Sequence, residues 1–250
     1  MITDAAFYAV AVPAVVMMGL SKSGFGAGFG ALAVPLVSLT VPVPQAAAIF
    51  LPLLLVMDML GVAALMRQAD WTLLRRVLPA GLVGTLLGTA LFRWLAPPLV
   101  AGVVGALTLA FVALRVLHPP RADAPAPPPW QGRVLATLSG FTSFVAHAGG
   151  PPMGFYMLPL RLAPLTFAAT MSVFFAAVNL SKWLPYAWLG LIDLDNMTTS
   201  LALMPAAPLG VWLGVRVVRR LSRRWFERIF VGGMLAAGLK LVHDALRALT

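Results

Sequence analysis

Positions 21–30 read Ser-Lys-Ser-Gly-Phe-Gly-Ala-Gly-Phe-Gly and lie between two strongly apolar segments. Both this stretch and a later one at 147–154 are too rich in glycine and proline to form one uninterrupted helix. The two stretches and the residues after them match at a spacing of 124: Gly26 with Gly150, Gly30 with Gly154, Pro35 with Pro159, and Leu36 with Leu160.

A second match supports the duplication. At a spacing of 126, six residues recur with the same identity: Pro79, Ala80, Gly84, Leu87, Gly88 and Arg93 correspond to Pro205, Ala206, Gly210, Leu213, Gly214 and Arg219. Paired, interrupted hydrophobic segments in two halves are the best sequence-level indication of the binding site of a secondary transporter. The glycines of this second match have the small-xxx-small spacing of closely packed membrane helices.

The composition predicts an all-α integral membrane protein. Hydrophobic residues make up 60% of the 250 residues, charged residues only 10%, and the mean hydropathy is +0.92. Such a chain has too little polar surface for a soluble globule. Cysteine is absent, which excludes disulfides, thiolate metal sites and haem attachment. No cofactor or metal is predicted.

Each half contains five apolar segments between breakers. The expected ranges are 5–20, 29–41, 44–66, 72–95 and 98–117, then 133–147, 151–162, 165–189, 198–221 and 225–247. The last three of each half have the roughly 20 residues that span a bilayer. The first two are shorter, and we expect short crossings or re-entrant pairs, hence 8 to 10 transmembrane or re-entrant helices in all. Residues 1–117 form the first repeat, 118–130 a proline-rich linker, and 131–250 the second repeat.

The basic residues predict the orientation. If the connection holding Arg67, Arg75 and Arg76 is cytoplasmic, 14 of the 18 lysines and arginines fall on that side and 2 on the other. Both termini are then periplasmic, the linker is cytoplasmic, and the halves enter the membrane with opposite sense. This arrangement is an inverted-topology repeat with the broken segments at the repeat interface. Because the basic residues lie at segment ends, nucleic acid is not an expected partner; membrane lipids and a small anion are, and a homodimer stays open.

The first glycine cluster is a candidate anion cradle. Its backbone N–H groups can face a cavity without obstruction, and a following half-helix adds the positive end of its dipole. The candidate contacts are Ser21, Lys22, Ser23, Gly24, Gly26 and Gly28. For these glycines the alternative is close helix packing in lipid, and for Lys22 it is a positive anchor at the cytoplasmic surface.

The second cluster supplies Thr142, Ser143, His147, Gly149 and Gly150 as candidate contacts. His147 could shuttle a proton or donate to an anion, or it could merely bond a neighbour.

Asp58 lies in an otherwise uncharged apolar segment, where a carboxylate is costly. The position 124 residues on is Lys182, with Asn179 beside it, and these two complete the candidate substrate contacts. We expect Asp58 to pair with Lys182 across the repeat interface and to carry a coupling proton. The alternatives are an inert buried pair and a charge that reaches toward the surface.

The chain resembles the sulfite exporter TauE/SafE family, also called the toluene sulfonate uptake permease family. The resemblance rests on Gly19 to Pro35 with Pro44-Gln45-Ala46-Ala47-Ala48 after it, on Ser139 to Pro159, and on the helices 79–88 and 205–214. It implies a carrier of small, often sulfur-containing anions such as sulfite, sulfonates or sulfoacetate in the bacterial inner membrane.

The sequence thus predicts a transporter, not an enzyme, that moves such an anion by alternating access. Within the transporter class, a carrier of a non-sulfur carboxylate or of a cation is the alternative. Outside it, the alternatives are a membrane scaffold and a cofactor-assembly protein. Three distant histidines and the absence of cysteine argue against the last.

Overall fold

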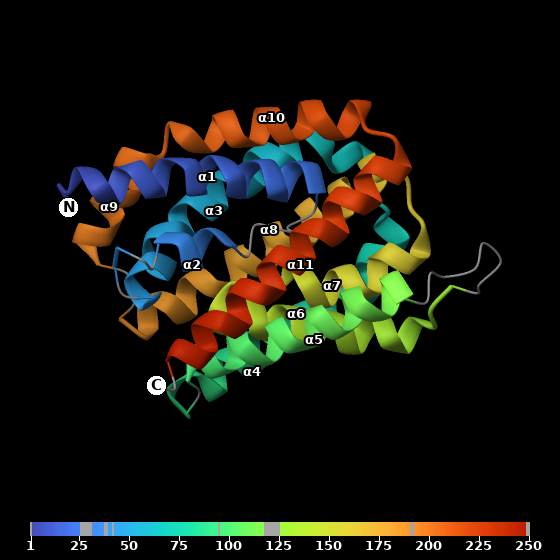
Figure 1. Cartoon of the computed structure of the whole chain (residues 1–250), viewed down its shortest axis with the longest axis horizontal. Helices are drawn as coiled ribbons and strands as arrows, with labels where there is room; N and C mark the ends of the chain where they lie inside the picture. Colours follow the sequence, from blue (N-terminus) through green and yellow to red (C-terminus); the bar gives the residue numbers. More distant parts are fainter. Residues whose placement is uncertain are drawn as a thin grey trace.

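A computed structural model describes residues 2–25, 32–37, 40–41, 43–94, 96–117, 126–190 and 193–248. Within these ranges the regular structure is entirely helical. The long helices run along the longest axis of the molecule, and both chain ends lie at the same end of the bundle, opposite the connection between the two halves (Figure 1).

The first half contains α1 (Ala5–Phe25), α2 (Ala33–Val37), α3 (Val43–Leu65), α4 (Trp71–Leu91) and α5 (Pro97–Leu117). The 3-10 turns Met66–Gln68 and Phe92–Trp94 precede and follow α4. The second half contains α6 (Pro129–Ala146), α7 (Gly150–Met157), the 3-10 turn Leu158–Leu160, α8 (Pro164–Trp188), α9 (Leu194–Leu203), α10 (Ala206–Arg220) and α11 (Arg223–Arg247).

Most predicted segments match these helices to within a few residues, with three corrections. The first helix does not end at residue 20, because residues 21–25 continue α1 to Phe25. The segment predicted at 198–221 is two helices, α9 and α10, bent by 50°. Helix α6 begins at Pro129, inside the range expected for the linker, because proline is accepted in a first helical turn.

Five helices are long and apolar enough to span a membrane: α1, α3 with its following turn, α4, α8 and α11. The bent pair α9–α10 adds a sixth if it is one span. The fold is therefore that of a multi-pass membrane protein, as the composition predicts.

Glycines bring two pairs of helices into backbone contact. A Cβ atom at Gly19 would lie 3.1 Å from the Cα of Gly210, and one at Gly24 would lie 3.0 Å from the Cα of Gly214. Because both positions advance together, α1 and α10 run in the same direction. Gly210 and Gly214 thus have the predicted role in close helix packing, and the residues they pack against are glycines of α1.

The same contact occurs between α4 and α6. A Cβ atom at Gly84 would collide with the backbone of Thr137 and Phe141, and one at Gly140 with the backbone of Gly81. By the spacing of the sequence matches, α6 corresponds to α1 and α4 to α10. Helix α1 therefore packs in parallel on α10 and α6 on α4, while α3 packs on α8 and α5 on α11.

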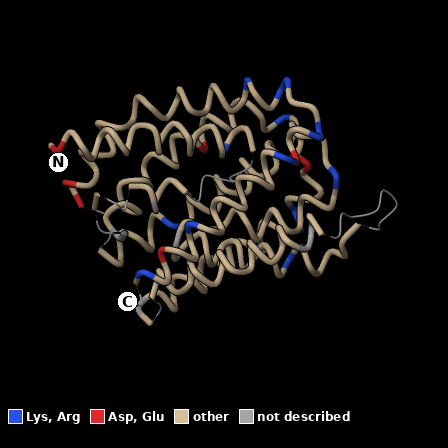
Figure 2. The backbone as a smooth tube through the Cα atoms, viewed as in Figure 1, with Lys and Arg blue, Asp and Glu red and all other residues tan. Residues whose placement is uncertain are grey.

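Charge is unevenly distributed along the bundle. Figure 2 shows most Lys and Arg residues at the end that holds the connection between the halves, and acidic residues near the N-terminus at the other end. Five tryptophans at or near helix ends are exposed, as expected of residues at a membrane–water interface: Trp71, Trp94, Trp130, Trp188 and Trp225.

Candidate functional site

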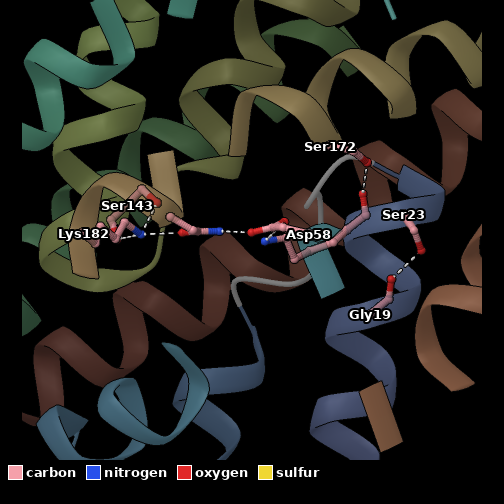
Figure 3. Close-up of polar contacts among 8 residues, drawn as sticks. Gly19, Ser23, Asp58, Ser143, Ser172 and Lys182 are labelled. Atoms are coloured by element: carbon pink, nitrogen blue, oxygen red, sulfur yellow. Dashed lines mark hydrogen bonds and ion pairs between the residues drawn. The ribbon is translucent and has the colours of Figure 1, made fainter. Parts of the chain in front are cut away.

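A chain of polar side chains crosses the interior where α1, α3, α8 and α6 meet. In order it contains Lys22, Asp58, Asn179, Lys182 and Ser143, and all five are buried. Figure 3 shows Asp58, Lys182 and Ser143 of this chain between the helices. We call this chain the polar network.

Asp58 of α3 lies between Lys22 and Asn179 in the polar network. Its Oδ1 forms an ion pair with the ammonium of Lys22 on α1, and its Oδ2 accepts a hydrogen bond of 2.7 Å from Asn179 Nδ2. Both carboxylate oxygens thus have a partner, which is what a buried carboxylate requires. The backbone carbonyl of Lys22 in turn lies 3.5 Å from Ser172 Oγ of α8.

Lys182 of α8 lies between Asn179 and Ser143 in the network. Its Nζ donates to the carbonyl oxygen and to the hydroxyl oxygen of Ser143, both at 2.7 Å, and to Asn179 Oδ1 at 2.8 Å. Three acceptors satisfy the three N–H bonds of an ammonium. Lys182 is fully buried and its donors are fully used.

The predicted direct pair between Asp58 and Lys182 is therefore wrong. Asn179 lies between them, donating through its nitrogen to Asp58 and accepting through its oxygen from Lys182. Sequence spacing alone cannot show this, because the partner of Asp58 comes from α1. The Lys22 ammonium is closer to Asp58 and takes the role assigned to Lys182.

The polar network has more basic than acidic groups. It contains two lysines and one aspartate, and among the described residues no second acid joins it. Lys22 differs from Lys182 in that Asp58 is its one described side-chain partner. Two of the N–H bonds of Lys22 thus have no described acceptor, at the point where α1 ends.

Helix α8 positions its polar residues by spacing. Asn179, Lys182 and Tyr186 are three and then four residues apart and share one face of the helix. The Tyr186 hydroxyl donates to the carbonyl oxygen of Phe144 at 2.8 Å and so fixes α8 against α6. Sequence reasoning missed Tyr186, although the same helical spacing could have identified it.

Two of the predicted first-cluster contacts have structural roles. The Ser23 hydroxyl lies 2.7 Å from the carbonyl oxygen of Gly19 and 3.1 Å from that of Val211, and its one proton serves these acceptors. Gly24 packs against the backbone of Gly214. Ser21 is fully buried within α1. Gly26 and Gly28 lie outside the described residues.

The second cluster is a break between two helices. Helix α6 ends at Ala146, His147 adopts a left-handed conformation with φ 50°, and α7 begins at Gly150. The break is narrower than the predicted stretch of 147–154, because residues 150–154 belong to α7.

Two hydroxyl groups of α6 form hydrogen bonds with backbone carbonyls of this break. Ser139 Oγ donates to the carbonyl oxygen of Gly149 at 2.7 Å, and the Thr142 hydroxyl lies 2.8 Å from the carbonyl oxygen of Leu138 and 3.2 Å from that of Ala148. Thr142, predicted as a substrate contact, therefore uses its proton on the backbone. A Cβ atom at Gly149 would lie 2.6 Å from the Ser139 carbonyl oxygen, so glycine is required there for packing.

His147 contacts α8. Its Nε2 lies 3.3 Å from the Tyr186 hydroxyl oxygen, and since Tyr186 donates its own proton to Phe144, His147 is the donor in this pair. Helix α7 offers few backbone donors at its start, because Pro151 and Pro152 follow Gly150 and have no N–H. Of the predicted contacts, the structure thus joins Lys22, Asp58, Ser143, Asn179 and Lys182 into one network.

Metal binding finds no support in the described ranges, where no three His, Asp or Glu side chains lie close enough to hold an ion.

A comparison with protein families identifies the chain. The model of the family described as sulfite exporter TauE/SafE matches residues 11–241, which is nearly the whole sequence. The chain belongs to the TauE/SafE family. The resemblance noted from the glycine motifs is thereby confirmed, and the matched range includes every residue of the polar network.

Membership of the TauE/SafE family makes the chain a multi-pass membrane transporter, in agreement with its long apolar helices. Comparisons with curated proteins and with solved structures gave no match.

Proposed function

We propose that this protein is a secondary transporter that carries a small, sulfur-containing anion of the sulfite, sulfonate or sulfoacetate class across the bacterial inner membrane. The observation that carries the proposal is the charge of the polar network: Lys22 and Lys182 stand against Asp58 alone. An uncompensated charge buried between membrane helices is costly. A negatively charged substrate removes that cost when it binds.

Lys22 is the group we assign to the anion. Its ammonium is held at one end of the network by Asp58, and its remaining N–H bonds are available to an oxyanion. Lys182 has no donor left, because Ser143 and Asn179 take all three. It acts as a fixed positive charge and, through Asn179, sets the position of Asp58.

Charge balance suggests how a proton is coupled. A monovalent anion beside the network makes the buried charge zero without any proton. A divalent anion such as sulfite leaves one negative charge in excess, which protonation of Asp58 removes. Proton uptake is therefore expected with divalent substrates and not with monovalent ones.

Alternating access by inverted repeats is the mechanism we propose. It is supported by the opposite directions of α1 and α6 along the bundle (Figure 1), helices that correspond at a spacing of 124 residues. The reciprocal packing of α1 on α10 and of α6 on α4 adds support, because a two-fold axis relating two inverted halves would exchange these pairs. Helices α3 and α8, which carry Asp58 and Lys182, meet at that axis.

The proposed orientation is supported by the basic end of the bundle in Figure 2. Under the positive-inside rule this end is cytoplasmic, and both termini are periplasmic.

A cation carrier is the less favoured alternative. It would need a carboxylate free to meet the ion, whereas both oxygens of Asp58 are already engaged by Lys22 and Asn179. A carrier of non-sulfur carboxylates fits the same charge and is separated only by the substrate test.

The test is uptake by proteoliposomes containing the purified protein, with sulfite, sulfoacetate, thiosulfate, acetate and potassium offered in turn. We expect saturable uptake of a sulfur-containing anion and none of potassium. Alanine at Lys182 or at Asp58 should abolish uptake. Undiminished anion flux in both variants would remove the polar network from the transport site.

A further inference from the structure

We propose that a cleft between the starts of α4 and α6 binds the phosphate of an anionic phospholipid headgroup. The cleft has a volume of about 460 Å³ and is lined by Thr72, Arg75, Arg76, Pro79, Ala80 and Arg133. We call it the arginine cleft. It is separate from the polar network, and the inference does not depend on the substrate that the protein carries.

The arginines of this cleft lack acidic partners. Arg76 and Arg133 have no ion pair or hydrogen bond among the described residues, and Arg75 Nε makes only a long contact of 3.4 Å with the carbonyl oxygen of Trp71. The nearby carboxylate, Asp70, is used as the cap of α4, where it accepts a hydrogen bond of 2.9 Å from the Leu73 amide. Three guanidinium groups therefore line one cavity without an acidic partner among the described residues.

Guanidinium groups match phosphate because their planar N–H donors can form two parallel bonds with its oxygens. Thr72 adds a residue with a hydroxyl group to the lining of the cleft. Helices α4 and α6 both begin here and run side by side, so the positive ends of two helix dipoles add to the field.

The ligand is a lipid because of where the cleft lies. Trp71 at the start of α4 and Trp130 at the start of α6 are 48% and 61% exposed, as is typical of side chains at headgroup level. Basic cavities between membrane helices at this level take up anionic headgroups. The volume is within the usual range for small-molecule sites.

The cleft is formed before any ligand arrives. Gly84 and Gly140 hold α4 and α6 in backbone contact just beyond it, so its two walls keep a fixed separation.

Native mass spectrometry of the detergent-solubilised protein tests the assignment. The double variant Arg76→Gln/Arg133→Gln removes two cleft charges. Its matched control, Arg220→Gln/Arg224→Gln, removes two exposed charges, one at the end of α10 and one in the first turn of α11. We expect dioleoylphosphatidylglycerol to bind the wild type and the control equally. It should bind the cleft variant at least about tenfold more weakly, because each lost charge-assisted bond costs about a factor of ten or more.

Two further measurements distinguish the phosphate of an anionic lipid from other phosphate groups. Dioleoylphosphatidylcholine should bind wild type and cleft variant alike, and millimolar inorganic phosphate should not displace phosphatidylglycerol. Displacement by phosphate would overturn the lipid assignment. Equal loss of lipid in both arginine variants would overturn the site itself.

Discussion

Lys22 of α1 and Asp58 of α3 form an ion pair inside the helix bundle, with only 6% and 2% of their side chains exposed. Asn179 extends this pair to Lys182, so one carboxylate is shared between two lysines from helices of different halves. The network therefore links the two halves and contains two lysines for one carboxylate.

Removal of Asp58 alone should destabilise the protein strongly. In Asp58→Asn the Lys22 ammonium stays buried without its partner, and breaking a buried pair in this way costs about 3 to 5 kcal/mol. Lys22→Met/Asp58→Asn removes both charges and should cost less. The measurement is thermal unfolding in detergent. Equal losses in the two variants would show that Lys22 is not held by Asp58.

Alanine should have opposite effects on stability at two glycines, one in the contact between α1 and α10 and one outside it. A Cβ atom at Gly214 would lie 2.6 Å from the Leu20 carbonyl oxygen, so Gly214→Ala should force the helices apart and lower the unfolding temperature. At Gly232 of α11 nothing lies within 4 Å, and Gly232→Ala should gain about 0.5 to 1 kcal/mol from helix propensity. Unchanged stability in Gly214→Ala would contradict the close packing of α1 on α10. A loss of stability in Gly232→Ala would contradict the open surroundings of Gly232.

The Ser139 hydroxyl should control the opening of the α6–α7 break. Ser139→Ala frees the Gly149 carbonyl, at a cost of about 1 kcal/mol, so the amides of residues 148–150 should exchange with solvent roughly fivefold faster. Thr137→Ala is the control, since that hydroxyl bonds only the Arg133 carbonyl within α6. If both variants exchange alike, Ser139 does not hold the break.

The orientation can be read from single cysteines, because the chain contains none of its own. Ala126→Cys lies in the linker, just before α6, and Leu194→Cys lies at the start of α9, where Leu194 is 84% exposed. A membrane-impermeant maleimide should label only Leu194→Cys in spheroplasts. Labelling of Ala126→Cys there would reverse the topology.

Much of the fold could be predicted from sequence because hydrophobic length and proline or glycine breaks fix where membrane helices begin and end. The bend between α9 and α10 was not predicted, since residues 201–215 contain no polar side chain and Pro205 falls where a helix interior was expected. Residues 21–25 stay helical despite their serines and glycine because Gly24 packs on Gly214 and Ser23 bonds backbone carbonyls.

The members of the polar network could be identified from the sequence, and their pairing could not. Charges in apolar segments identified Lys22, Asp58 and Lys182, and proximity in sequence identified Asn179. Which lysine meets Asp58 depends on how α1 packs against α3, a long-range relationship that no local pattern contains. Hydroxyls such as Thr142 were assigned to substrate because sequence cannot show that a nearby carbonyl already takes their proton.

The central claim is that Lys22 contacts the anion, and sulfite uptake by Lys22→Met/Asp58→Asn proteoliposomes tests it most directly. This variant keeps the buried charge of the wild type, because Lys182 remains. The control Lys240→Met/Asp244→Asn makes the same two changes in the peripheral pair of α11. We predict that uptake falls at least about tenfold in the first variant, as for a lost charged contact, and is unchanged in the second. Wild-type uptake by Lys22→Met/Asp58→Asn would contradict the account.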